Sequence, residues 1–123
     1  MGLVCTFASD IIVIMNWILL ETPAQLAEIK QREGYSIIFK HSTRCSISMM
    51  AKKRFELDWN DLPDDVPMYF LDLIRFREIS NKIAEDFKVY HQSPQLLLIK
   101  DGECVLDQSH GDISVDEAVS VLN

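Results

Sequence analysis

Short apolar runs and helically spaced apolar residues alternate along this chain of 123 residues. Residues 35–40 combine aromatic and β-branched side chains, as in a strand buried at the centre of a sheet. Residues 66–71 form a second such run, with Pro67 near its beginning. Residues 17–20 form a shorter apolar segment, which we do not count among the predicted strands.

Capping signals mark where the first and last helices begin. Thr22 and Gln25 have the spacing of a capping box, so a helix is predicted from about residue 23 to residue 33, stopped by Gly34. Ser114 and Glu117 have the same spacing before a closing helix.

The apolar faces of three helices follow from helical spacing. One helix begins at or just after Cys45, another follows the second strand, and the third closes the chain. Their predicted core-facing residues are Ile47, Met50, Ala51 and Phe55; then Phe76, Ile79, Ile83 and Phe87; then Val115, Ala118, Val119 and Leu122.

A hairpin is predicted late in the chain. Residues 96–99 and 104–106 are short strand-like runs, and Asp101-Gly102 between them is a strong hairpin signal, so the two strands should be antiparallel. The predicted order is therefore helix, strand, helix, strand, helix, hairpin, helix. Such an order predicts an α/β domain with a central mixed β-sheet flanked by helices.

The first residues do not fit this pattern. We divide the chain into residues 1–14, interpreted as an extension or a mis-assigned start with Met15 as the alternative initiator, and a single domain over residues 15–123. An additional edge strand in the first segment is an equally open interpretation. The apolar run there is interrupted by Asp10 and Asn16 and has no Lys or Arg before Lys30, so we predict neither a signal peptide nor a membrane helix.

The acidic composition and the few cysteines limit which partners and which compartment the protein can have. Asp and Glu number 19 against 12 Lys and Arg, a formal net charge of −7, which argues against binding a phosphate backbone. Three cysteines, Cys5, Cys45 and Cys104, are an odd and low number for a secreted disulfide scaffold. We therefore expect a cytoplasmic protein with at least one free thiol and no nucleic-acid or membrane partner.

Cys45 is the candidate reactive group. It lies between a predicted buried strand and a predicted helix, where helix N–H groups favour a thiolate. Arg44 is adjacent, and Lys40 and His41 precede it, which predicts a positive environment. The thiolate is the species that attacks disulfides. A buried structural cysteine is the alternative, although inert cysteines usually lie within apolar strands rather than in a Ser-Thr-Arg-Cys-Ser loop.

No resolving cysteine follows Cys45 at the spacing of a dithiol redox motif. The sequence there is Cys45-Ser46-Ile47-Ser48, so an exchange must pass the mixed disulfide to an external thiol, and Ser48 is at most a hydrogen-bond donor to the sulfur. Cys104 lies in the predicted hairpin and is interpreted as a filler of the core or edge, with a resolving role left open.

The histidines and the Ser93-Pro94 bond are also candidate functional features. The histidines are too scattered for a metal site, and we predict none; they are His41, His91 and His110. Ser93-Pro94 directly precedes a predicted strand, where a tight turn into the sheet makes a cis bond plausible. Because most X-Pro bonds are trans, an ordinary proline at a strand start is the alternative.

Several segments resemble the monothiol bacilliredoxins, redox proteins of the bacillithiol system. Phe39-Lys40-His41-Ser42-Thr43-Arg44-Cys45 resembles their active-site loop. Ser80-Asn81 followed by Ile83-Ala84-Glu85 resembles the family's third helix, and residues 91–95 resemble its cis-proline loop. Residues 100–102 with Ser109-His110 and Ile113 resemble its hairpin and exit. The similarity covers residue 17 to the end of the chain.

The resemblance implies a thioredoxin-like fold and the removal of bacillithiol from mixed disulfides on proteins, with Cys45 accepting the small thiol. Bacillithiol would be a co-substrate, with no bound cofactor, and the partners would be bacillithiolated proteins and a reductase of the thiol, in cell redox homeostasis. The supporting residues would be Thr43, Arg44, Ser46, Ser48, Ser93 and Pro94. The family commonly has proline where this chain has Ser46, which adds an N–H and a hydroxyl beside the sulfur.

Two other functions compete with a thiol-disulfide oxidoreductase of this type. One is a non-catalytic thioredoxin-fold interaction or stress-response module in which Cys45 is only a site of modification. The other is a reductase for a small oxidised substrate such as arsenate or peroxide, against which the missing resolving cysteine counts. Turnover separates the first two, because only a transferase is regenerated by a thiol and its reductase.

Overall fold

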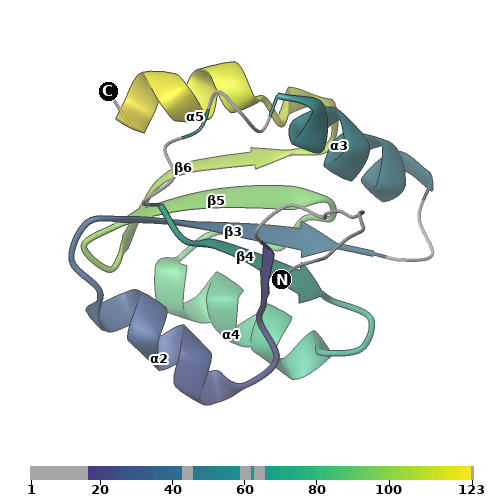
Figure 1. Cartoon of the computed structure of the whole chain (residues 1–123). Helices are drawn as coiled ribbons and strands as arrows, with labels where there is room; N and C mark the ends of the chain where they lie inside the picture. Colours follow the sequence, from purple (N-terminus) through teal and green to yellow (C-terminus); the bar gives the residue numbers. More distant parts are fainter. Residues whose placement is uncertain (1–16, 43–45, 59–61, 63–65, 123) are drawn as a thin grey trace, which may run out of the picture.

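A mixed five-stranded sheet organises the computed structural model, which describes residues 17–42, 46–58, 62 and 66–122 (Figure 1). Its strand order is β2-β4-β3-β5-β6. The strands are β2 (Trp17–Leu19), β3 (Tyr35–His41), β4 (Met68–Asp72), β5 (Gln95–Lys100) and β6 (Glu103–Ser109). β2 and β3 run parallel to β4, whereas β5 is antiparallel to both β3 and β6. The predicted α/β class with a central mixed sheet is confirmed.

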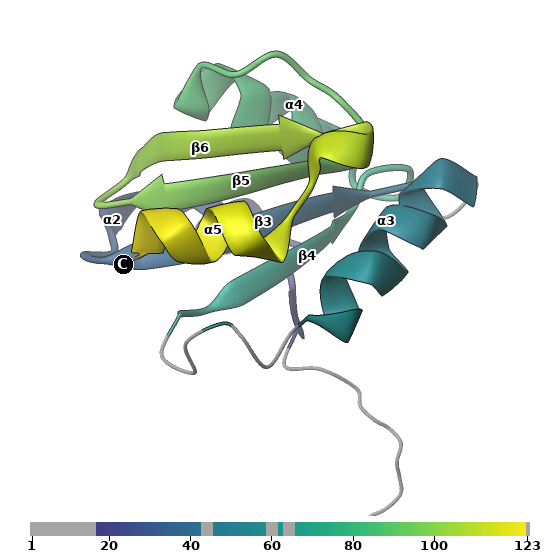
Figure 2. The ribbon, with the colours of Figure 1, turned by 90° about the horizontal axis from the view of Figure 1, so that it is seen from above.

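Helices cover both faces of this sheet (Figures 1 and 2). α2 (Pro23–Gln31) and α4 (Arg77–Phe87) lie on one face, and α3 (Ser46–Leu57) and α5 (Val115–Leu122) lie on the other. A short 3-10 helix, η2 (His110–Asp112), precedes α5. None of the helices in the described part of the chain has the length and apolar character to cross a membrane.

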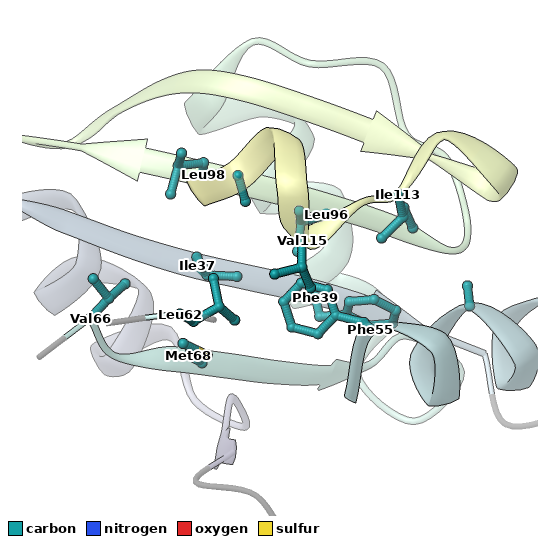
Figure 3. Packing of buried hydrophobic residues seen from close by; sticks show 12 residues of the cluster. Ile37, Phe39, Phe55, Leu62, Val66, Met68, Leu96, Leu98, Ile113 and Val115 are labelled. Carbon is teal, nitrogen blue, oxygen red and sulfur yellow. The ribbon is translucent and has the colours of Figure 1, made fainter. Parts of the chain in front are cut away.

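β3 lies inside the sheet and contributes to two separate cores. Its side chains alternate between faces, so Ile37 and Phe39 pack toward α3 and α5, whereas Ile38 packs toward α2 and α4. Figure 3 shows the first of these cores, in which the ring centroids of Phe39 and Phe55 are 5.8 Å apart. The aromatic and β-branched run that predicted β3 reflects burial on both faces of the strand.

β2 is a strand that the sequence pattern did not predict. Trp17 is paired with Met68 in the parallel register, and the N–H of Leu20 donates to the carbonyl oxygen of Phe70 at 2.9 Å. The Trp17 ring also packs against Phe39, with ring centroids 5.8 Å apart. A three-residue strand is too short to show a period, and its partner β4 is distant in sequence. The proposed extension, residues 1–14, lies outside the described residues.

The two predicted capping boxes differ in outcome. Thr22 and Gln25 form both reciprocal hydrogen bonds, as predicted. At α5 only half of the box is present, because Ser114 Oγ accepts from the N–H of Glu117 at 3.4 Å. Gln108 from β6 replaces the other half: its Oε1 accepts from the N–H of Ser114, and its Nε2 donates to Glu117 Oε2.

The buried face of α3 differs from the prediction at one position. Ala51 and Phe55 are buried as predicted, but the prediction for Met50 is wrong, because this side chain is 67% exposed. Ser48 is instead fully buried on the core side. Spacing of apolar residues alone misses a polar residue on a core-facing row. The side chain of Ile47 lies outside the described residues.

The hairpin between β5 and β6 is confirmed as antiparallel, and its turn is fixed to the rest of the fold. Asp101 and Gly102 have φ angles of 51° and 84°, the left-handed region that favours glycine. Asp101 Oδ1 accepts from the N–H of Gly34 at 2.7 Å. A Cβ atom added to Gly102 would lie 2.3 Å from the carbonyl oxygen of Lys30.

We therefore expect Gly102→Ala to destabilise the protein by about 2 kcal/mol or more, because it combines an unfavourable φ with a backbone clash. Gly111→Ala is the matched control, since nothing lies within 4 Å of an added Cβ there. Urea unfolding of both variants measures the difference. Equal stability of the two variants would contradict this account of the turn.

Candidate redox site

The candidate site lies where β3 ends and α3 begins. β3 ends at His41 and α3 begins at Ser46, so the strand and helix predicted on either side of Cys45 are present. Ser46 is exposed on the first turn of the helix. Thr43, Arg44 and Cys45 lie outside the described residues.

The loop that precedes β5 reaches the same edge of the sheet. Lys40 is paired with Gln95 in the antiparallel register, which places Pro94 beside the end of β3. The Ser93-Pro94 bond is cis, and Pro94 is buried. The Gln95 side chain holds this loop, because its Nε2 donates to the carbonyl oxygen of Tyr90 at 2.9 Å. Ser93 Oγ is buried without a hydrogen-bond partner.

Lys40 is a fully buried lysine on the face of the sheet covered by α2 and α4. Its Nζ donates to His91 Nδ1 at 3.3 Å, and Ser80 Oγ of α4 lies 3.3 Å from the same nitrogen. No ion pair to Lys40 is formed within the described ranges. Burial lowers the pKa of Lys40 to about 8.

His91 is the acceptor that this lysine uses. Desolvation first, and then the charges of Lys40 and Arg77, lower the pKa of His91. The imidazole therefore stays neutral at pH 7, with Nδ1 able to accept. This hydrogen bond joins two residues that are 51 positions apart and links the end of β3 to the loop that carries Pro94.

His41 is buried on the opposite face, against α3. Its Nδ1 lies 2.8 Å from Ser48 Oγ, and the N–H of Ser42 donates to the same oxygen at 3.0 Å. The His41 and Phe70 ring centroids are 5.3 Å apart. Burial, and then the charge of Lys52, lower the pKa of His41.

These positions change the expected electrostatics of the site. We expected Lys40 and His41 to add positive charge near Cys45. Burial lowers the pKa of both side chains, to about 8 for Lys40, so Lys40 still carries its charge at pH 7; the two side chains face opposite sides of the sheet. Neither was predicted to form the hydrogen bonds described above. The available signal was two consecutive polar residues at the end of an otherwise apolar strand.

Cys104 has the properties of a filler thiol. It is half-buried in β6, and its Sγ donates weakly to the carbonyl oxygen of Leu106 at 3.4 Å. Burial, and then the charge of Asp107, raise the pKa of Cys104 to about 11. The thiol is therefore protonated at neutral pH and is a poor nucleophile.

No group of three or more His, Cys, Asp or Glu side chains within the described ranges has the arrangement of a metal site. His41 and His91 are instead engaged in the hydrogen bonds described above. His110 lies apart from both, in η2.

Comparison with known proteins decides the family. Residues 18–118 match the family model described as monothiol bacilliredoxin BrxC. The chain belongs to the monothiol bacilliredoxin family. The resemblance in the sequence around Cys45 is thereby confirmed.

Solved structures support the same assignment of the fold. A structure assigned as an oxidoreductase with a thioredoxin fold is similar with a TM-score of 0.76 and 29% identity, over 88% of this chain and 95% of that chain. The thioredoxin of Malassezia sympodialis is similar with a TM-score of 0.68 and 18% identity, over 94% of this chain and 97% of that one. This bacilliredoxin thus has a thioredoxin-like fold, and its family and fold support a thiol redox function.

We expect Lys40→Met to change how stability depends on pH. The pKa of Lys40 is depressed in the folded state, so between about pH 8 and 10.5 the unfolded chain binds more protons and the wild type gains stability as pH rises. The methionine variant lacks this gain. The free energy of unfolding of Lys40→Met minus that of wild type should be greatest below about pH 8. This difference should fall by about 1–3 kcal/mol between about pH 8 and 10.5.

Urea unfolding across this pH range measures the effect. Lys53→Met is the matched control, because Lys53 is exposed on α3. If the difference in free energy of unfolding between Lys40→Met and wild type stays constant with pH, the claim that burial lowers the pKa of Lys40 is wrong.

Proposed function

We propose that this bacilliredoxin removes bacillithiol from mixed disulfides on proteins, with Cys45 as the single reacting thiol. The observation that carries the proposal is the match to the monothiol bacilliredoxin family over residues 18–118, which includes Cys45. Its position between β3 and α3 supports the same role, because the N–H groups at the start of a helix favour a thiolate.

The chemistry is a thiol-disulfide exchange in two steps. The Cys45 thiolate attacks the bacillithiol sulfur of the mixed disulfide, a new S–S bond forms, and the protein cysteine leaves as a thiolate that takes up a proton. A second thiol, free bacillithiol or a dithiol reductase, then attacks the Cys45 adduct. This step reduces the adduct, oxidises the incoming thiol, and regenerates the Cys45 thiolate.

The resolving thiol comes from outside the chain in this proposal. Position 48 is serine, which cannot form a disulfide. Cys104 has a pKa raised to about 11 and lies in β6, separated from β3 by β5. A protonated thiol on that strand is poorly suited to attack an adduct on Cys45.

The supporting residues have distinct roles in the proposal. Ser46 offers its backbone N–H at the start of α3, and Arg44 offers a positive charge. On the family's pattern, Thr43 and Pro94 flank the Cys45 sulfur and shape the groove for the disulfide partner, with Ser93 immediately before the proline. Bacillithiol is the co-substrate, and the reducing cytoplasm is where its reductase would return the protein to its working state.

We expect Cys45→Ser to abolish the reaction. With a bacillithiolated protein as substrate and free bacillithiol as reductant, the rate of bacillithiol release, measured by intact mass, should fall at least about a hundredfold, because serine supplies no thiolate at neutral pH. Cys104→Ser is the matched control and should keep a rate within about twofold of wild type.

Two results would overturn this proposal. One is an equal loss of rate in Cys104→Ser, which would make Cys104 a resolving thiol. The other is a wild-type protein that takes up bacillithiol at Cys45 but is never regenerated by bacillithiol or its reductase, because that behaviour belongs to a modification site.

A further inference from the structure

A cavity of about 420 Å³ lies where α2 and α4 begin, on the face of the sheet that these two helices cover (Figure 1). Its size falls in the range of about 300–1,000 Å³ that is usual for pockets that hold small molecules. β2 and β4, the strands that precede the two helices, are parallel, so both helices begin at the same edge of the sheet. Small molecules bind α/β sheets outside the carboxyl ends of the strands, and this cavity has that position.

Positive charge dominates the wall of this cavity. Arg75, Arg77 and Lys82 line it, against one carboxylate, that of Glu78. Lys82 is paired with Asp86 at 3.4 Å, but neither arginine forms an ion pair with another residue that the structure describes. Because the whole chain has a formal net charge of −7, the cavity is a local reversal of sign.

The rest of the lining is apolar and helps to place one of the two guanidinium groups. It consists of Pro23, Phe76 and Ile79. The guanidinium carbon of Arg75 lies 5.3 Å from the centroid of the Phe76 ring, a cation–π contact. A few charged groups within apolar walls are typical of sites that hold a small molecule in one orientation.

The cavity shares an edge of the sheet with the loop that carries Pro94. The last residues of β3 and β4, His41 and Asp72, are paired in register, and α4 follows β4. Arg77 lines the cavity and is also close enough to His91, in that loop, for its charge to lower the pKa of the imidazole. Arg77 therefore lies between the cavity and the loop before β5.

We propose that this cavity binds a small organic anion through a carboxylate or phosphate group, whose oxygens accept hydrogen bonds from the guanidinium groups of Arg75 and Arg77. Carboxylates and phosphates share the pair of acceptor oxygens that a guanidinium binds with two parallel N–H donors. Lys82 adds a third positive charge, and the apolar lining contacts the carbon skeleton of the ligand. The site is separate from the exchange reaction, because its binding needs no thiol.

The test is a titration of the full chain, labelled with ¹⁵N, at low ionic strength, followed by the chemical shifts of the backbone amides. Malonate and inorganic phosphate are the anionic ligands, and malonamide is the neutral counterpart of malonate. At least one anion should shift the amides of residues 75–82 in a saturable way, with a Kd of about 1–10 mM, whereas malonamide should not. The anion that binds identifies the group as carboxylate or phosphate. Added salt should weaken the binding, since both arginines are exposed.

Charge variants locate the binding on the cavity. Replacing both arginines, with Arg75→Gln and Arg77→Gln, should weaken it at least about tenfold, because the paired N–H donors are lost. Glu78→Gln should tighten it about two- to threefold, because a repelling carboxylate leaves the wall. Lys53→Gln with Arg54→Gln is the matched control. It removes the same charge from exposed positions on α3 and should change the Kd by less than about twofold.

Three results would overturn the proposal. The first is the absence of a saturable shift with either anion, and the second is an equal response to malonamide. The third is an equal loss of binding in the α3 control, which would show attraction by the overall charge alone. Since the titration involves neither bacillithiol nor Cys45, its outcome is independent of whether the proposed exchange reaction is correct.

Discussion

The end of β3 carries two consecutive polar side chains that are buried on opposite faces of the sheet. Burial of an ammonium and of an imidazole is costly unless each finds a hydrogen-bond partner. Lys40 finds His91, in the loop before β5, and His41 finds Ser48, on the first turn of α3. These partners belong to the loop that carries Pro94 and to the helix that follows Cys45 in the sequence. The end of β3 is therefore linked by hydrogen bonds to both of these segments.

Cys104 and Cys45 lie in different parts of the chain relative to the strands and helices. Cys104 is half-buried beside Asp107, and both burial and charge oppose its thiolate. Cys45 falls between β3 and α3 in the sequence, and in the proposal the N–H groups at the start of α3 favour its thiolate. In the proposed reaction Cys45 is the reactive thiol. Because position 48 is serine and Cys104 is inert, the second thiol of each cycle must then be supplied by a partner.

Local patterns in the sequence predicted most of the fold, because they report burial and turn geometry directly. The run that became β3 and the Asp101-Gly102 turn are examples. β2 was missed because three residues show no period and depend on a distant partner strand. The strand before Cys45 and the helix after it could be predicted, because both follow from short-range sequence patterns. The contact between Lys40 and His91 could not be, because it depends on the pairing of β3 with β5.

The most direct measurement of the central claim locates the bacillithiol adduct on the wild-type protein. The chain is incubated with a bacillithiolated protein under limiting free thiol, alkylated, digested and analysed by peptide mass spectrometry. The account predicts one bacillithiol per chain, on Cys45, with Cys5 and Cys104 recovered as alkylated thiols. An adduct on either of the other cysteines, or a disulfide between Cys45 and Cys104, would contradict a one-thiol exchange through Cys45.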